Sequence, residues 1–209
     1  MLRFDPAGYP FIGVSAGLAI VAGYVVTPWL ALPLLALAAF FLFFFRDPER
    51  TAASGADAVL SPADGRVLVA GPAVPGAAPA GEWQQISIFL SPMNVHVNRV
   101  PVSGRVTSVS YMPGKYLPAY AHDAATANER SEIWIDHHGQ TIVARQIVGL
   151  LARRVVCRLT EGATVQAGER YGVMKFGSRM DIFLPTTAEI VVEVGAVVRA
   201  AESVIAVLH

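Results

Sequence analysis

Charged residues are scarce in this chain of 209 residues, and the scarcity is local. Asp, Glu, Lys and Arg make up 15% of the sequence, against about 25% in an average soluble domain, and none lies between Gly8 and Phe45. The formal net charge is zero and there is no block of lysine or arginine, which argues against a nucleic-acid partner. The single cysteine, Cys157, excludes an internal disulfide and fits a reducing compartment.

The uncharged stretch predicts a membrane anchor within residues 1–50. Two apolar segments, Gly8–Val26 and Leu30–Phe45, are separated by Thr27-Pro28-Trp29. A spanning helix needs about 20 apolar residues, so the first segment is long enough and the second is short. The pattern leaves open a helical hairpin that spans the bilayer and a re-entrant pair that only enters it.

The charges that flank the anchor predict its orientation. Arg3 precedes the uncharged stretch and Arg46 and Arg50 follow it, which places both ends, and the domain that follows, on the cytoplasmic side of the cell (inner) membrane. A cleaved signal peptide ending at Ala56-Asp57-Ala58 is the competing interpretation. It is disfavoured because the apolar stretch is much longer than the roughly 7–15 residues of a signal-peptide core.

Residues 51–209 are long enough for one domain with its own core, and their pattern predicts a mainly β (α+β) fold. Short Val- and Ile-rich runs are separated by glycine and proline, which favours a flattened antiparallel β-barrel or sandwich. Helix is expected only around Ala119–Arg130, with a single turn at Pro92–Val95. The expected strands are Val59–Leu60, Gly65–Ala70, Gln85–Leu90, Gly104–Tyr111, Glu132–Asp136, Gln140–Val148, Val155–Leu159, Tyr171–Lys175, Met180–Leu184, Glu189–Val194 and Ser203–Leu208.

One segment resembles a different class of protein. Glu161–Phe176, "EGATVQAGERYGVMKF", has the glycine spacing of a β-hairpin and is similar to biotinyl and lipoyl carrier domains, in which a lysine follows methionine at a hairpin tip. Met174-Lys175 stands near that place. A carrier domain modified on Lys175 is therefore one alternative, and a non-enzymatic membrane-tethered β-domain is another.

Polar residues that a β-domain does not need mark the candidate site. Asp64 lies in an Asp-Gly pair, which is also a favoured turn, and His96 alternates with valines, as a structural hydrogen-bonding histidine also does. Ser178 follows Gly177 just ahead of an apolar run. Together Asp64, His96 and Ser178 supply an orienting acid, a base and a nucleophile. No G-x-S-x-G elbow is present, which argues against an α/β-hydrolase, and no metal site is assigned, since His137-His138 suits a hairpin turn.

Five motifs in order carry a resemblance to a known family. They are "FFRDPER" after the apolar stretch, "SPADGRV", "MNVHVNRVP", "PGKY…NER" and "FGSRMDIFLP", and they run from about Phe43 to Pro185. In this order they resemble the phosphatidylserine decarboxylases, and most closely the short, archaeal-type branch of that family.

The resemblance implies a proenzyme that cuts itself between Gly177 and Ser178. Ser178 would attack the Gly177 carbonyl and end as a pyruvoyl group, which serves as an electron sink in place of an external cofactor or metal. The products would be a large chain of residues 1–177 and a small chain of residues 178–209, packed together. The implied substrate is phosphatidylserine in the bilayer, converted to phosphatidylethanolamine and CO2. Assembly into a homo-oligomer is left open.

The resemblance also assigns roles to residues. Asp64 and His96 would complete the self-cleavage triad. The better-known bacterial branch has a second histidine three positions after the first, where this chain has Arg99, so His96 would serve as base in cleavage and as proton donor in decarboxylation. His122 is the reserve for one of these roles and a further possible substrate-binding residue. Arg99 and Lys115 are candidates for binding the lipid phosphate, with solvated surface charge as the alternative.

Overall fold

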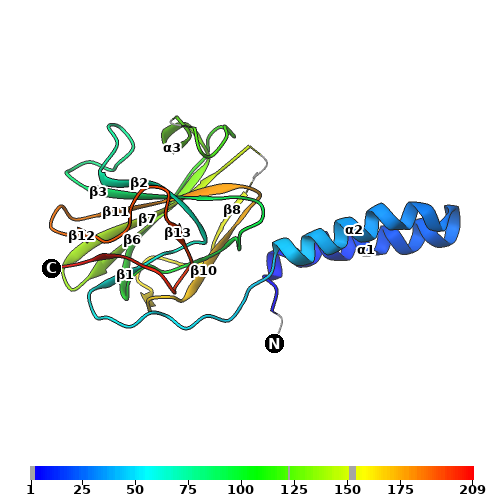
Figure 1. Cartoon of the computed structure of the whole chain (residues 1–209), viewed down its shortest axis with the longest axis horizontal. Coiled ribbons are helices and arrows are strands. Elements are labelled where there is room, and N and C mark those ends of the chain that lie inside the picture. The colour runs from blue at the N-terminus through cyan, green and yellow to red at the C-terminus, as the bar shows by residue number, and fades with distance from the viewer. Residues whose placement is uncertain (1–2, 122, 151–153) are drawn as a thin grey trace. The chain divides into compact units, whose positions relative to one another are not determined.

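The computed structural model describes residues 3–121, 123–150 and 154–209. The chain divides into two compact units, Met1–Glu49 and Arg50–His209. Figure 1 shows a helical N-terminal unit and a C-terminal unit built mainly of strands.

The N-terminal unit is a helical hairpin. A short 3-10 turn, η1 (Pro6–Gly8), leads into α1 (Tyr9–Val21) and a π-helical segment, η2 (Ala22–Val26). Thr27 is extended, and α2 (Pro28–Phe44) returns. The two ends of the hairpin are tied by backbone hydrogen bonds from Asp5 to Phe45 and from Asp47 to Arg3, both 2.8 Å long.

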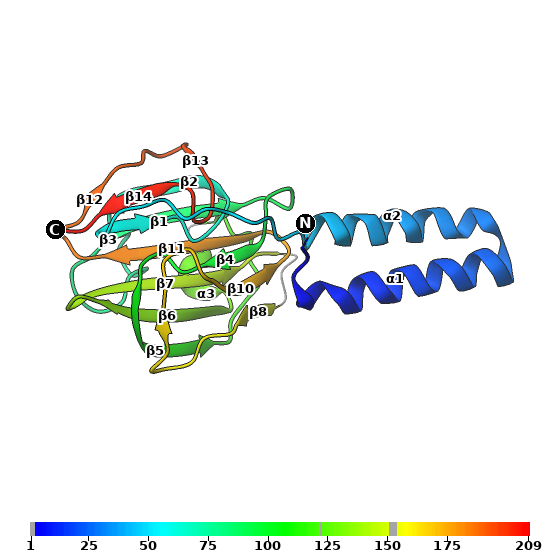
Figure 2. The same cartoon turned by 90° about the horizontal axis from the view of Figure 1, so that it is seen from below.

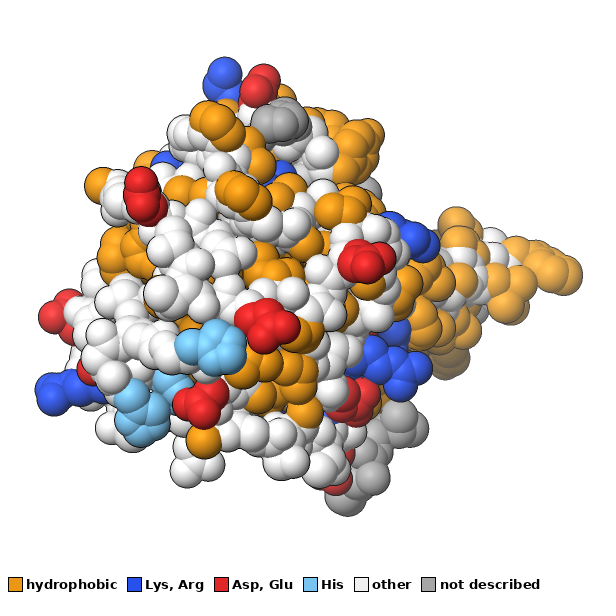
Figure 3. Space-filling view, turned by 60° about the vertical axis from the view of Figure 1, so that its left-hand side comes forward, with side chains coloured by type: hydrophobic (Ala, Val, Ile, Leu, Met, Phe, Trp, Pro, Cys, Tyr) orange, Lys and Arg blue, Asp and Glu red, His pale blue; other side chains and the backbone are white. Residues whose placement is uncertain are grey.

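Both helices of the hairpin are apolar on all sides, and many of their large side chains are exposed, as Ile20 and Trp29 are. Figure 3 shows hydrophobic side chains covering the hairpin, whereas charged and hydrophobic side chains mix on the visible face of the C-terminal unit. The continuous helical stretch Pro6–Val26 is long and apolar enough to cross a membrane by length and composition, and Pro28–Phe44 is shorter.

The C-terminal unit is dominated by an eight-stranded antiparallel sheet. Figure 2 shows its central strands crossing the unit side by side. Its strand order is β13 (Val197–Val198), β2 (Gly65–Pro72), β3 (Gln84–Leu90), β11 (Ser178–Leu184), β7 (Gln140–Val148), β6 (Arg130–His137), β5 (Gly104–Met112) and β9 (Thr164–Val165).

Two three-stranded sheets complete the described strands. One has the order β1 (Ala58–Leu60), β14 (Val204–Val207), β12 (Glu189–Ile190), and the other β4 (Val97–Arg99), β10 (Arg170–Lys175), β8 (Arg154–Cys157). The mainly β, antiparallel fold with few helices is confirmed. The large sheet ends in β13 on one side and β9 on the other, so within the described residues it is an open sheet and not a closed barrel.

Burial on both faces explains why the central strand β11 lacks the usual alternation of exposed and buried side chains. All seven of its residues are buried. Met180, Ile182 and Leu184 belong to the main core, together with residues of β2, β3, β6 and β7. Arg179, Asp181 and Phe183 alternate with them and lie on the opposite face.

The local expectations were met only in part. Of the helix expected around Ala119–Arg130, the described residues form only α3 (Ala124–Ala127), and Pro92–Val95 is a turn closed by a hydrogen bond from Asn94 N to Ser91 O. The hairpin expected in Glu161–Phe176 does not form, because β9 pairs with β5 whereas β10 pairs with β4 and β8. The strands β4, β9 and β13 were not expected at all.

Candidate active site

The Gly177-Ser178 bond lies where two sheets of the C-terminal unit meet. Ser178 begins β11 in the eight-stranded sheet, where it is opposite Leu90 of β3 and Val148 of β7. Gly177 has φ +69°, a conformation that costs glycine little, and it connects β11 to the end of β10 in the other sheet. The Gly177-Ser178 peptide bond is thus held in a sharp turn between two paired strands.

Ser178 is buried, yet its hydroxyl is unsatisfied. The side chain has no solvent exposure, and Oγ has no hydrogen-bond partner within the described parts of the chain. A buried hydroxyl without a partner costs stability, so it needs an explanation. A nucleophile held for attack on a neighbouring carbonyl is such an explanation.

His96 lies beside this turn with a defined tautomer. Its Nε2 accepts a hydrogen bond from Gly177 N at 3.4 Å, and its Nδ1 lies 3.0 Å from the carbonyl oxygen of Asn94. An amide N–H can only donate and a carbonyl can only accept, so we assign the imidazole proton to Nδ1. Nε2 then carries the lone pair of a general base, one residue from Ser178.

Two titratable groups in the neighbouring strands, Tyr171 and Cys157, are held in the protonated form. Complete burial raises the pKa of Tyr171 well above its usual range, and burial also raises the pKa of the Cys157 thiol. Neither group therefore offers a base near neutral pH. The buried imidazole of His96 contacts the turn directly, through Nε2 and Gly177 N.

A buried amide pair lies on the same side of the sheet. Asn98 follows His96 by two residues, and its Oδ1 accepts a 2.8 Å hydrogen bond from Gln146 Nε2. Gln146 is opposite Met180 of β11. Asn98 Nδ2 and Gln146 Oε1 have no hydrogen-bond partners among the described residues, so two polar atoms are open inside the core close to the start of β11.

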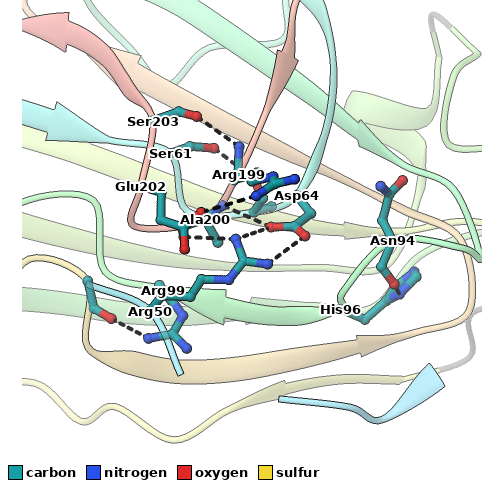
Figure 4. A network of polar contacts seen from close by, with 12 residues as sticks. Arg50, Ser61, Asp64, Asn94, His96, Arg99, Arg199, Ala200, Glu202 and Ser203 are labelled. Carbon is teal, nitrogen blue, oxygen red and sulfur yellow. Dashed lines mark hydrogen bonds and ion pairs between the residues drawn. The ribbon is translucent and has the colours of Figure 1, made fainter. Parts of the chain in front are cut away.

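Asp64 is engaged elsewhere. Its carboxylate forms an ion pair with Arg50, with Nη1–Oδ1 and Nη2–Oδ2 distances of 2.7 Å, and accepts a 2.9 Å hydrogen bond from Ala200 N. Figure 4 shows Asp64 turned toward Arg50, while His96 lies beside Asn94. The structure therefore brings His96 and Gly177-Ser178 together. The group that contacts His96 Nδ1 and orients the imidazole is the carbonyl of Asn94.

The three predicted lipid-binding residues have different surroundings. Arg99 is buried, and its Nη1 donates a 3.0 Å hydrogen bond to Gly168 O. Lys115 is exposed in a loop, where its backbone forms an isolated β-bridge with Asn128. His122 lies outside the described residues. Their role in binding phosphate stays a prediction.

Asn128 and Gly149 make two further contacts near the start of β11. Asn128 Oδ1 accepts from Leu117 N at 2.9 Å, and its Nδ2 donates to Leu117 O and Val148 O at 2.8 Å each. A Cβ placed on Gly149 would lie 2.2 Å from the Gly177 oxygen, so only glycine lets the backbone pack against the Gly177 carbonyl. Sequence patterns point to neither contact, because both join segments far apart in the chain.

Comparison with known proteins shows the family to which the chain belongs. Residues 37–206 match the family model for phosphatidylserine decarboxylase. The chain belongs to the phosphatidylserine decarboxylase family. This range includes His96, Gly177 and Ser178, and the described residues contain no group of three or more His, Cys, Asp or Glu that could hold a metal ion.

Two relatives in the phosphatidylserine decarboxylase family align with this chain over most of their own length. The chain is 46% identical over 182 residues to a phosphatidylserine decarboxylase proenzyme of Prosthecochloris aestuarii, which covers 87% of this chain and 83% of the relative. It is 44% identical over 202 residues to the phosphatidylserine decarboxylase proenzyme of Oleidesulfovibrio alaskensis. This alignment covers 96% of this chain and 92% of the relative. The family resemblance is confirmed, and the archaeal-type branch stays a prediction.

Proposed function

We propose that the protein is a proenzyme that cuts itself between Gly177 and Ser178 and then decarboxylates phosphatidylserine to phosphatidylethanolamine at the membrane. The observation that carries the proposal is the buried, unpartnered Ser178 hydroxyl next to a turn glycine whose N–H meets His96 Nε2. The relatives' printed name, proenzyme, supports a precursor that is processed.

Cleavage would begin with a proton transfer. His96 Nε2 accepts the proton of Ser178 Oγ as the oxygen attacks the carbonyl carbon of Gly177. The C–N bond then breaks, the proton passes to the departing nitrogen, and the amide becomes an ester between Gly177 and the Ser178 side chain. The open, left-handed turn at Gly177 leaves the carbonyl carbon accessible for this attack.

The ester would then break by elimination. Removal of the Ser178 α-proton expels the Gly177 carboxylate and leaves dehydroalanine at position 178. Water replaces the nitrogen, ammonia departs, and the small chain begins with a pyruvoyl group. The products are residues 1–177 and 178–209, a small chain of 209 − 177 = 32 residues.

The residues around position 178 fit such a group. A pyruvoyl group supplies an electron sink that stabilises the negative charge left when CO2 departs. Removal of the serine hydroxyl from its buried position eliminates a polar group that has no partner. His96 remains beside the new chain end, where its protonated Nε2 can donate to the carbon that lost CO2.

The hairpin supports a substrate in the bilayer. Pro6–Val26 is long and apolar enough to span a membrane, and Arg3, Arg46 and Arg50 flank the hairpin sequence, which favours a cytoplasmic catalytic unit at the inner membrane. A tethered enzyme meets a two-chained lipid without extracting it into water. An anchor would give no such advantage with a soluble amino acid as substrate.

Intact mass of the purified protein and of its Ser178→Ala variant tests the proposal. The unmodified sequence should give two chains, the smaller starting at residue 178 without a free amine, and Ser178→Ala should give one inactive chain. Ser131→Ala, which alters another buried serine, is the control and should be processed normally. Normal cleavage of Ser178→Ala would contradict the proposal, an added biotinyl or lipoyl mass on Lys175 would favour the carrier alternative, and an unmodified single chain would favour a non-enzymatic domain.

A further inference from the structure

The end of the large sheet where Ser178 lies exposes most of the large apolar side chains of the C-terminal unit. Leu90 of β3 and Val148 of β7 are both opposite Ser178, so these strands reach the same end. Among the described residues of this unit, eight large apolar side chains are exposed. Five of them lie in or next to the segments that leave the sheet at this end, namely Met93, Tyr111, Tyr116, Tyr120 and Leu150. Single exposed apolar residues are ordinary, whereas a cluster at one end marks an interaction surface.

Tyr120 and Leu150 belong to two segments that pack on the Gly177 carbonyl. A Cβ built on Gly149 would meet both the Gly177 oxygen and, at 3.1 Å, the Cβ of Ala119. The chain neighbours of these two contacting residues are Tyr120 and Leu150, which are 67% and 62% exposed. Both side chains are therefore exposed close to the turn that carries position 178.

Met93 lies on a third segment that reaches the same turn. It precedes Asn94, whose carbonyl contacts Nδ1 of His96, and Nε2 of His96 accepts a hydrogen bond from Gly177 N. The Met93 side chain is 63% exposed. Met93, Tyr120 and Leu150 are called the rim below, because all three are exposed on segments that contact the Gly177-Ser178 turn or its histidine.

Basic side chains accompany the rim. Lys115 is exposed in the loop that leads to Tyr120. Arg154 is exposed at the start of β8, opposite Lys175 near the end of β10. Asp123 adds one exposed carboxylate in the same region. Tyrosine and aliphatic side chains interspersed with lysine and arginine are typical of surfaces that settle at the interface of an anionic bilayer.

We propose that the rim docks on a bilayer that contains anionic phospholipid, with Met93, Tyr120 and Leu150 inserted at the level of the headgroups. The inference rests on the proposed function, in which position 178 acts on a lipid, and it adds a second membrane contact to that of the apolar hairpin. A tether keeps the catalytic unit within reach of the bilayer but does not choose the face that meets it. A docked rim would present the turn at position 178 to the headgroups.

A bilayer suits this surface better than a protein partner does. The rim comes from three separate segments around the turn. A protein seated on all three would cover the turn and close position 178 to its substrate. A bilayer in the same place supplies that substrate, and its anionic headgroups complement Lys115 and Arg154.

The test uses the full-length protein carrying Cys157→Ala and a fluorophore attached at Leu150→Cys or Met93→Cys. The protein is placed in vesicles of phosphatidylcholine and phosphatidylglycerol, in which some phosphatidylcholine carries a quencher on its acyl chain. Both labels should lose most of their emission, since interfacial side chains insert about 5–10 Å into the boundary between headgroups and acyl chains. His138→Cys lies in the exposed turn between β6 and β7, at the other end of these strands. It is the matched control, and its label should keep its emission.

The charge requirement is tested by leaving out phosphatidylglycerol. Each lysine or arginine near an anionic surface favours docking by about five-fold, so quenching at position 150 should weaken in vesicles of phosphatidylcholine alone. Unchanged quenching there would overturn the requirement for anionic lipid.

Each outcome bears on docking separately from the proposed function. Neither vesicle lipid has a primary amine, so the labels report docking whether or not the protein cuts itself, and Ser178→Ala should be quenched equally. Equal quenching at positions 138 and 150, or none at either, overturns the inference. A label at position 150 that enters apolar surroundings but escapes the lipid quencher would show that a second copy of the chain or another protein covers the rim. If Leu150→Cys fails to fold, Met93→Cys decides.

Discussion

At the scale of single residues, the position of one proton on His96 determines what the site can do. Because Nδ1 faces the Asn94 carbonyl and Nε2 faces the Gly177 N–H, the lone pair is on the nitrogen next to the scissile turn. In the opposite tautomer the Nε2–H of His96 would face the N–H of Gly177, so two hydrogen-bond donors would meet. A backbone carbonyl can therefore hold the base in its useful form without a carboxylate.

We expect His96→Gln to slow self-cleavage by a factor on the order of 10²–10⁴, the usual contribution of a general base. Glutamine can still accept from Gly177 N but cannot take a proton from Ser178. The measurement is the fraction of uncut chain on a denaturing gel, followed with time after synthesis. Cleavage of His96→Gln at the unsubstituted rate would exclude His96 as the base.

Asp64→Asn separates the two possible orienting groups. If Asp64 must turn from Arg50 to orient His96 during cleavage, Asp64→Asn should slow the cut about as much as His96→Gln does. If the Asn94 carbonyl suffices, Asp64→Asn should cleave at close to the normal rate and mainly lose stability, since the Arg50 ion pair is broken.

At the scale of elements, hydrophobic runs between turn residues predicted most of the strands, because these runs must be buried wherever they lie. The runs did not predict which strands pair. Glu161–Phe176 has hairpin spacing, yet β9 and β10 go to different sheets. The sequence likewise places Ser178 in a turn-strand motif. It is silent on the contact of the Asn94 carbonyl with His96 and on that of Gly149 with Gly177, which joins distant segments.

The Asn128 side chain is one of the groups that hold the loop carrying Lys115 and Tyr120. Asn128, fully buried, makes three hydrogen bonds that join Leu117 to the end of β7. Asn128→Ala leaves buried backbone groups unpaired, and we expect the free energy of unfolding to fall by about 2–3 kcal/mol. Denaturant unfolding measures this loss, and Thr126→Ala, which alters an exposed hydroxyl within α3, should change stability little. A stability equal to that of the unsubstituted protein would show that the loop has other support.

At the scale of the whole molecule, the proposed cut falls between two sheets and not between two domains. The small chain, residues 178–209, would contribute β11, β12, β13 and β14. Of these, β11 lies between β3 and β7, β14 pairs with β1, and β13 pairs with β2. Every partner named here belongs to the large chain, so the cut would break one bond of the backbone and leave the ladders intact.

We therefore expect the two chains to remain one particle after cleavage. Native size-exclusion chromatography in detergent should give a single peak that contains both chains, and the small chain should separate only in denaturant. All seven side chains of β11 are buried, and Met180, Ile182 and Leu184 lie in the main core, so release of the small chain would expose the centre of that core to water. Elution of residues 178–209 as a separate species under native conditions would mean that cleavage loosens the sheet. In that case the site beside His96 would be lost after cleavage, because position 178 would leave together with β11.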